Sequence, residues 1–204
     1  MRKWYSCNFS VSWDRGQKPK IWVDIFIIDT IVGKIISQKK SEIALWRIHR
    51  RWANDEHGHE LTFDLTFDCF TNEEAAKAIE SLIKDNMHFK ILKEAGLLTD
   101  GKELKISPKT NDIASDTGWP EPLKESWPYY INGCCEMFLS LIENIKGGKS
   151  VPHDINNAEK FYTEVNNEII RIWQSFGCNA FFHHISAIFG YEPLSVSMGL
   201  WGRF

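Results

Sequence analysis

The chain has 204 residues, with 24 lysines and arginines against 27 aspartates and glutamates, which gives a formal net charge of −3 with histidines neutral. Hydrophobic residues make up 43% and charged residues 25%, so a disordered or fibrous chain is excluded. This charge balance argues against nucleic-acid or membrane-surface binding. No apolar run reaches the roughly 18–20 residues of a membrane-spanning helix, and the first residues lack the apolar segment of a secretory signal. We therefore predict a cytoplasmic protein with no nucleic-acid or membrane partner.

The five cysteines are an odd number and include no C-x-x-C pair, which argues against a disulfide framework and a zinc ribbon. We expect them to be reduced and mostly buried. Nine tryptophans supply large apolar areas, each with one N–H that needs a partner when buried, and we expect some of them to line a groove. The odd cysteine count and the many aromatics are compatible with a homodimer but do not require one.

The first half of the chain predicts a sheet built from two strand–strand–helix units. Residues 4–13 and 21–28 flank turn-forming residues and predict a hairpin, and apolar residues at helical spacing over 31–36 predict a short helix. Residues 43–52 and 59–70 predict the second pair of strands; in the latter, apolar and polar residues alternate with a period of two. A capping box at residues 71–74 then opens a helix that is expected to run to about residue 95.

The second half predicts helices. Residues 99–126 are polar and rich in proline, so we expect a long loop. A helical pattern over 131–145 stops at two glycines. A second helix is expected to begin at a capping pair formed by Asn156 and Glu159 and to be interrupted at Gly177. A shorter helix is expected over about 179–189, and the tail to residue 204 is expected to form a final strand. The predicted class is a single α+β domain over 1–204, in which an antiparallel or mixed sheet (1–98) packs with a helical C-terminal half (127–204).

The predicted strand at 43–52 carries a row of cationic or titratable side chains. Because successive side chains on a strand alternate between faces, Arg47, His49 and Arg51 share one face. If that face meets solvent, guanidinium groups there can grip a carboxylate or a phosphate. The alternative interpretation is an ordinary exposed polar sheet face.

Arg50 lies on the opposite face of the same strand, between Ile48 and Trp52. That face is expected to be covered by the rest of the protein, so an arginine there requires a specific role or partner. Arg50, and Trp52 on the same face, are therefore candidate site residues.

Two histidines, His57 and His59, flank Gly58 at the predicted turn. They would bind a metal only with a third ligand, and Glu60 points the other way on a strand, so we predict no metal site. An ordinary pair of residues at the end of a hairpin is the alternative interpretation to a role of His59 in substrate binding. The sequence contains no Gly-rich phosphate loop, nucleophile elbow or dinucleotide fingerprint, and we predict no cofactor.

A second candidate segment is the apolar helix that contains His183 and His184. Neighbouring residues on a helix point about 100° apart, so at most one of the two histidines lies in any single pocket. We expect this helix to be buried, in which case a histidine must find a partner or act as a proton carrier. A satisfied core histidine is the alternative.

These segments, taken in order, resemble the C-terminal domain of lantibiotic dehydratases, which also occurs as a free-standing thiopeptide-type bacteriocin biosynthesis protein. In that family an opening Trp-Tyr strand and a short helix precede an aromatic-Ile-Arg-Tyr strand, a turn and a His-Ile-Arg-Leu-Arg-Phe strand. Here residues 48–52 (Ile-His-Arg-Arg-Trp) look like the first of these motifs, and 59–63 (His-Glu-Leu-Thr-Phe) occupy the place of the second. Residues 182–190 look like the family's late His-Met-His-like helix.

The resemblance implies chemistry on a peptide: elimination of glutamate from glutamylated serine or threonine, or joining of two dehydroalanines. It would make Arg50 the stabilising cation and His183 or His184 the proton carrier. Leu61 and Phe63 stand where the family's second strand has arginines, so a glutamate-gripping site of that type is incomplete here.

The sequence therefore predicts a peptide-modifying protein of ribosomal peptide natural-product biosynthesis, with a lyase-like activity on a peptide substrate. The predicted substrate-binding residues are Arg47, His49, Arg51, Trp52 and His59. The competing interpretation is a non-catalytic scaffold of the same fold, which holds a peptide or partner protein with exposed tryptophans and by strand addition at a sheet edge.

Overall fold

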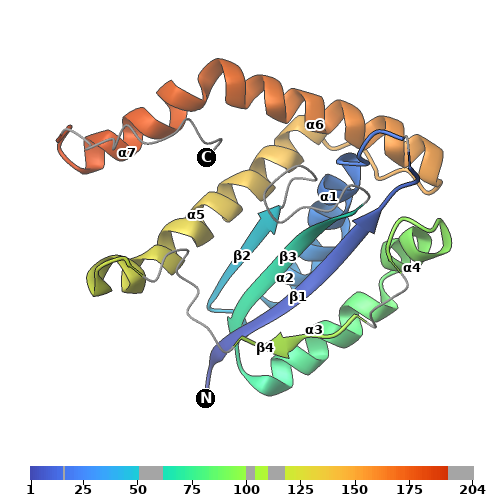
Figure 1. Cartoon of the computed structure of the whole chain (residues 1–204), viewed down its shortest axis with the longest axis horizontal. Helices are drawn as coiled ribbons and strands as arrows, with labels where there is room; N and C mark the ends of the chain where they lie inside the picture. Colours follow the sequence, from blue (N-terminus) through green and yellow to red (C-terminus); the bar gives the residue numbers. More distant parts are fainter. Residues whose placement is uncertain (16, 51–61, 100–103, 110–117, 193–204) are drawn as a thin grey trace. The chain divides into compact units, whose positions relative to one another are not determined.

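The structure is a computed structural model that describes residues 1–15, 17–50, 62–99, 104–109 and 118–192 (Figure 1). The chain divides into two compact units, Met1–Asn166 and Asn167–Phe204. The sheet lies in the first unit. In the part of the chain that the structure describes, no helix is both long and apolar enough to cross a membrane.

The first unit is built on a four-stranded antiparallel sheet with the strand order β2-β3-β1-β4. The two central strands, β1 (Lys3–Ser12) and β3 (Thr62–Thr71), pair along their whole length. The edge strands are β2 (Leu45–Arg50) and the two-residue β4 (Ser107–Pro108). With its helices, this sheet confirms the predicted α+β class.

The predicted hairpin at the start of the chain is wrong, because its second strand is a helix. Helix α1 (Trp22–Ile27) continues through a π-helical turn, Ile28–Val32, into α2 (Gly33–Lys39). Every residue of α1 and of the π-helical turn is buried, so the segment has no exposed face and carries no amphipathic period. A short, mostly apolar run of this kind fits a buried strand and a buried helix equally well. The element order is therefore strand, helix, strand, strand, helix.

The helical segment after β3 consists of two helices instead of the predicted one. Asn72 caps α3 (Glu73–Asp85), and its side chain accepts a hydrogen bond from the Ala75 amide at 2.9 Å. The helix thus begins where predicted, but the predicted capping box is wrong, because Thr71 ends β3 and its hydroxyl donates to the Glu42 carbonyl at 2.8 Å. The chain then breaks at Asn86, whose side-chain oxygen accepts from the His88 amide at 2.8 Å and caps α4 (Met87–Glu94). The break follows from this second cap.

The predicted loop at 99–126 contains regular structure, since β4 and the start of α5 (Glu121–Lys146) lie within it. Pro122 stands in the first turn of α5, where its missing N–H leaves no hydrogen bond unmade. The helix ends as predicted at Gly147, which adopts a left-handed conformation with φ of 59°.

Helix α6 (Ile155–Gly177) continues through a π-helical turn, Cys178–Phe182, into α7 (His183–Ile188). The predicted interruption at Gly177 is therefore wrong, because that residue keeps helical dihedral angles. The predicted capping pair of Asn156 and Glu159 is wrong, because Asn156 lies inside the helix and the carboxylate of Asp154 accepts from the Asn157 amide at 3.0 Å instead. The predicted final strand in the tail falls at 193–204, outside the described residues.

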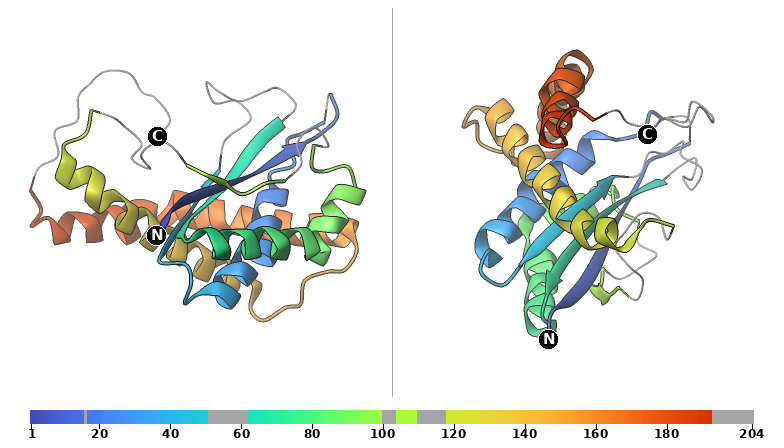
Figure 2. Two further views of the ribbon diagram at one scale, coloured as in Figure 1. Left: turned by 90° about the horizontal axis from the view of Figure 1, so that it is seen from below. Right: turned by 90° about the vertical axis from the view of Figure 1, so that its left-hand side faces the viewer.

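The sheet of the first unit has one apolar and one polar face. The helices α2 and α3 lie on the apolar side (Figure 2). The core side chains on that side include Tyr5, Cys7, Phe9 and Val11 from β1, and Phe63, Leu65, Phe67 and Cys69 from β3. The alternating polar residues of the same strands point to the other side, as the period of two predicts.

Helix α5 covers the outer edge of β2. The Trp46 amide donates to the side-chain oxygen of Asn132 at 2.7 Å, and the Ile48 amide donates to the sulfur of Cys135 at 3.3 Å. The indole N–H of Trp46 donates to Glu136 at 2.7 Å. Side chains thus occupy the edge amides of β2, which blocks strand addition at these positions.

A buried ion pair joins the π-helical turn to the end of α5. The Lys146 ammonium donates to Asp29 at 2.7 Å, and the hydroxyl of the fully buried Tyr162 donates to the other oxygen of the same carboxylate. The extra residue of a π-helical turn changes which side chains point inward. Burial alone would lower the pKa of Lys146, but hydrogen bonds with Asp29 and Glu143 outweigh it and raise the pKa. The ammonium is therefore charged.

Candidate functional site

On the polar face of the sheet, the strand register places polar side chains from three strands side by side. We call it the polar sheet face and define it by Ser6, Asn8, Ser10, Arg47, His49, Asp64, Thr66 and Asp68. In the first row, Ser6 and Arg47 stand on either side of Asp68, and in the second row Asn8 and His49 flank Thr66. The side chains of Asn8 and His49 are exposed, so the middle of this face meets solvent. This confirms that Arg47 and His49 share a face.

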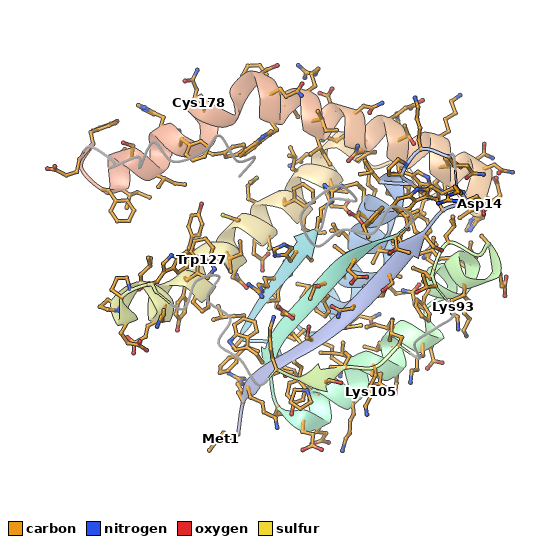
Figure 3. The ribbon with its side chains drawn as sticks, viewed as in Figure 1. Met1, Asp14, Lys93, Lys105, Trp127 and Cys178 are labelled. Carbon is orange, nitrogen blue, oxygen red and sulfur yellow. The ribbon has the colours of Figure 1, made fainter. Side chains whose placement is uncertain are left out.

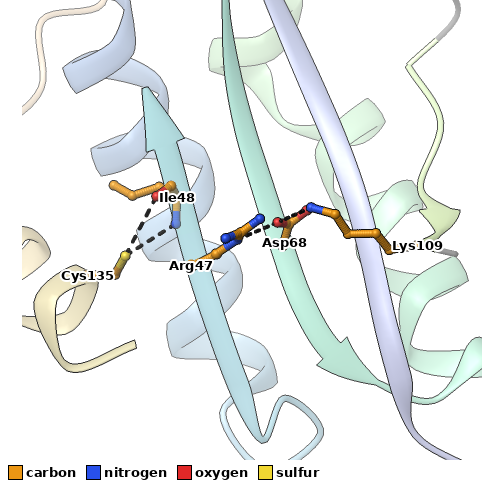
Figure 4. Close-up of polar contacts among 5 residues, drawn as sticks. All are labelled: Arg47, Ile48, Asp68, Lys109 and Cys135. Atoms are coloured by element: carbon orange, nitrogen blue, oxygen red, sulfur yellow. Dashed lines mark hydrogen bonds and ion pairs between the residues drawn. The ribbon is translucent and has the colours of Figure 1, made fainter. Parts of the chain in front are cut away.

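Asp68 is the centre of the first row and has no exposed surface. One of its oxygens accepts from Arg47 Nε at 2.7 Å and from Lys109 Nζ at 2.9 Å (Figure 4). Burial works to raise the pKa of Asp68, but hydrogen bonds from Ser6, Arg47 and Lys109 outweigh it and lower the pKa. The carboxylate is thus ionised at neutral pH, and it holds the two cations in fixed positions at the border of the polar sheet face.

A pocket of about 300 Å³ opens beside β1, next to the polar sheet face. Its polar lining includes Asn8, Asp64, Lys93 and Lys105. The two lysines lie on the side of β1 away from β3 (Figure 3). Asp64 accepts a hydrogen bond from the Ser10 hydroxyl at 2.5 Å, which orients the carboxylate. The two ammonium groups and one carboxylate leave the pocket with an excess of positive charge.

Arg50 lies on the helix side of the sheet, as the alternation predicts. Its Nε donates to Asp24 at 2.9 Å, a second guanidinium nitrogen contacts Asn166 at 3.4 Å, and the guanidinium lies 5.8 Å from the ring centre of Phe138. Asp24 belongs to α1 and is only 2% exposed. Burial raises the pKa of Asp24 to about 6, although the charge of Arg50 and its hydrogen bond act in the opposite direction. Arg50 therefore has a structural partner that the predicted hairpin did not reveal.

The raised pKa of Asp24 predicts a pH-dependent stability. The folded protein binds the proton more tightly than the unfolded chain, in which the pKa of this carboxyl has its ordinary value of about 3.8. The stabilisation is thus complete below about pH 4 and is lost as the pH rises through about 6, by about 2–3 kcal/mol. The measurement is the difference in unfolding free energy between the wild type and Asp24→Asn from pH 4 to pH 8. A difference that stays constant over this range would contradict the assignment.

His183 and His184 lie in the second unit and are exposed, so the expectation that their helix is buried is wrong. Their rings lie 5.5 Å apart at an angle of 73°, and His183 Nε2 lies 3.5 Å from the Tyr191 hydroxyl. Arg50 belongs to the first unit and the two histidines to the second. The prediction that they act together on one substrate stays a prediction.

Three predicted substrate-binding residues, Arg51, Trp52 and His59, lie outside the described residues. The sequence reasoning missed Asp68, Asp64 and Lys109. The two aspartates alternate with apolar residues along β3 and served only as evidence for its period. Asp68 could be identified as the partner of Arg47 only from the register in which β2 pairs with β3, and the sequence does not supply that register.

Within the described ranges, no three histidine, cysteine or acidic side chains gather in a geometry that would hold a metal ion. Of the described tryptophans, Trp13, Trp22 and Trp46 are buried, Trp4, Trp119 and Trp127 are half-buried, and Trp173 is 55% exposed. No protein-family model matches this chain, and comparisons with curated proteins and with solved structures find no significant match.

Proposed function

We propose that the protein binds a peptide on the polar sheet face and that it does so in the biosynthesis of a ribosomally made peptide natural product. The observation that carries the proposal is the buried Asp68, which fixes Arg47 and Lys109 at the border of an exposed polar surface. Cations in fixed positions lose little freedom when an anion binds. The motif resemblance to lantibiotic dehydratase C-terminal domains supports the biosynthetic setting.

The charge of this surface favours an acidic side chain of the peptide as the recognised group. Arg47 and Lys109 share the single carboxylate of Asp68, and Lys93 and Lys105 line the neighbouring pocket beside Asp64. The pocket therefore carries more positive than negative charge. A glutamate on the peptide would find an ammonium partner in the pocket or at Lys109.

The test is a fluorescence anisotropy titration of the full chain with a short labelled peptide rich in glutamate, and with its counterpart that carries glutamine at the same positions. Lys109→Gln should weaken binding of the glutamate peptide about tenfold, since one charge-assisted hydrogen bond is lost. Lys160→Gln removes the same charge from an exposed position on α6 and should leave the affinity unchanged. Equal binding of both peptides, or equal effects of both variants, would contradict the proposal.

A lyase activity is the second candidate function, and the Asp24–Arg50 pair favours it. A carboxyl with a pKa of about 6 next to a guanidinium is suited to move a proton near neutral pH. Incubation with a glutamylated peptide followed by mass spectrometry would reveal loss of glutamate. His183→Ala and His184→Ala should abolish that loss without unfolding the chain if either histidine carries the proton.

A further inference from the structure

The continuous helix from α6 to α7 carries one apolar row along its whole length. Its members recur three or four residues apart, which places them on one side of a helix. The single spacing of five falls at the π-helical turn Cys178–Phe182, where one extra residue per turn keeps the row in line. We call this row the apolar seam; it consists of Ala158, Tyr162, Val165, Ile169, Ile172, Phe176, Phe181, Ile185 and Ile188.

The burial of the seam changes along the helix. Its first members, from Ala158 to Ile169, are at most 7% exposed. Further along, Phe176 is 51% exposed and Ile188 is 81% exposed. The seam therefore continues with the same spacing beyond the part of the helix where it is buried. Its second half presents large apolar side chains to water.

Other exposed side chains widen this second half of the seam into a surface. Seven large apolar residues of the second unit are 41–81% exposed: Ile170, Trp173, Phe176, Phe182, Ile188, Phe189 and Tyr191. At about 150–250 Å² for a fully exposed large side chain, they expose on the order of 800 Å². A standard protein interface takes about this area from each partner, and soluble monomers rarely expose so large an apolar patch.

The charges on this segment fit a second copy of the chain. From 167 to 189 the sequence contains one acidic and one basic residue, Glu168 and Arg171. They form an ion pair with each other at 2.6 Å, so neither requires an oppositely charged residue on a binding partner. Two copies of this surface can meet without repulsion between like charges, and a row of spacing three and four is the pattern that pairs one helix with another.

We propose that the second unit is a dimerisation element, in which the exposed half of the apolar seam packs against the same surface of a second copy. A two-fold axis makes such an interface self-complementary, so the single surface serves both chains. This inference does not depend on the proposed function.

The test is sedimentation equilibrium of the full chain at micromolar concentrations. We expect the mass of two chains for the wild type. Phe176→Asp and Ile188→Asp should each raise the dimer dissociation constant at least about 30-fold, because each places a charge in the apolar contact. Ser175→Asp introduces the same charge at an exposed position on the side of the helix that faces away from these apolar residues, and it should leave the dimer intact.

Two outcomes would overturn the proposal. One is a wild-type chain that stays monomeric, which would mean that the seam is covered within its own chain or by a different protein. The other is a dimer that both seam variants leave unchanged, which would place the contact elsewhere. Far-ultraviolet circular dichroism of each variant separates loss of the dimer from loss of the helix, and Ile188, at 81% exposure, is the position least able to disturb folding.

Discussion

Replacing Lys146 by methionine should destabilise the first unit by about 3–5 kcal/mol, the usual cost of removing one partner of a buried ion pair. Lys146 is the cation that neutralises Asp29, whose side chain is only 3% exposed. After the substitution the carboxylate keeps the Tyr162 hydroxyl but loses its counter-charge. Methionine fills a volume similar to that of the lysine stem, so the loss reports the charge and not a cavity.

Chemical denaturation at neutral pH measures this effect. Lys149→Met, at an exposed lysine three residues further on, is the matched control and should change stability by less than about 0.5 kcal/mol. The double variant Asp29→Asn/Lys146→Met should recover most of the loss, because it removes both charges together. A single variant as stable as the control, or a double variant as unstable as the single one, would show that the pair does not act as an ion pair.

Replacing Asp68 by alanine should have the second large effect, a destabilisation of about 3 kcal/mol together with loss of peptide binding. The carboxylate binds both Arg47 and Lys109, so its removal takes this counter-charge from two cations at once. Those two side chains are 12% and 25% exposed, so they regain part of their hydration and the cost falls at the low end of the range for buried pairs.

The two consequences of Asp68→Ala are measured separately. Denaturation gives the stability, and anisotropy with the glutamate-rich peptide, at a temperature where the variant is folded, gives the affinity. Asp85→Ala removes an exposed carboxylate at the end of α3 and should leave both quantities unchanged. If Asp68→Ala binds the peptide more tightly than the wild type, the cations do not need Asp68 for their positions, and the account of the polar sheet face is wrong.

Local patterns predicted the fold where one face of an element meets water. The alternation along β3 and the start of α3 after Asn72 depend on neighbouring residues alone, and both are confirmed. The segment 21–28 has no such pattern, because α1 is buried on every side. The π-helical turns likewise lack a local signal, and only packing decides where an extra residue enters a helix.

The candidate site was predictable only in part, for a related reason. The sequence places Arg47 and Arg50 on opposite faces of a strand, and the structure confirms this. The sequence could not identify the partners of these arginines. Asp68 contacts Arg47 because of the register between β2 and β3, and Asp24, the partner of Arg50, lies on α1, which was predicted to be a strand. Contacts between distant segments require the tertiary fold.

The central claim is that the polar sheet face binds an acidic peptide, and an NMR titration tests it most directly. The amide resonances of the full chain are followed while the glutamate-rich peptide is added. We predict the largest shifts at Asn8, Thr66 and His49, which form one row of the face, and at Lys109 beside it. Shifts confined to the second unit, or no shifts at peptide concentrations that saturate the anisotropy signal, would contradict the claim.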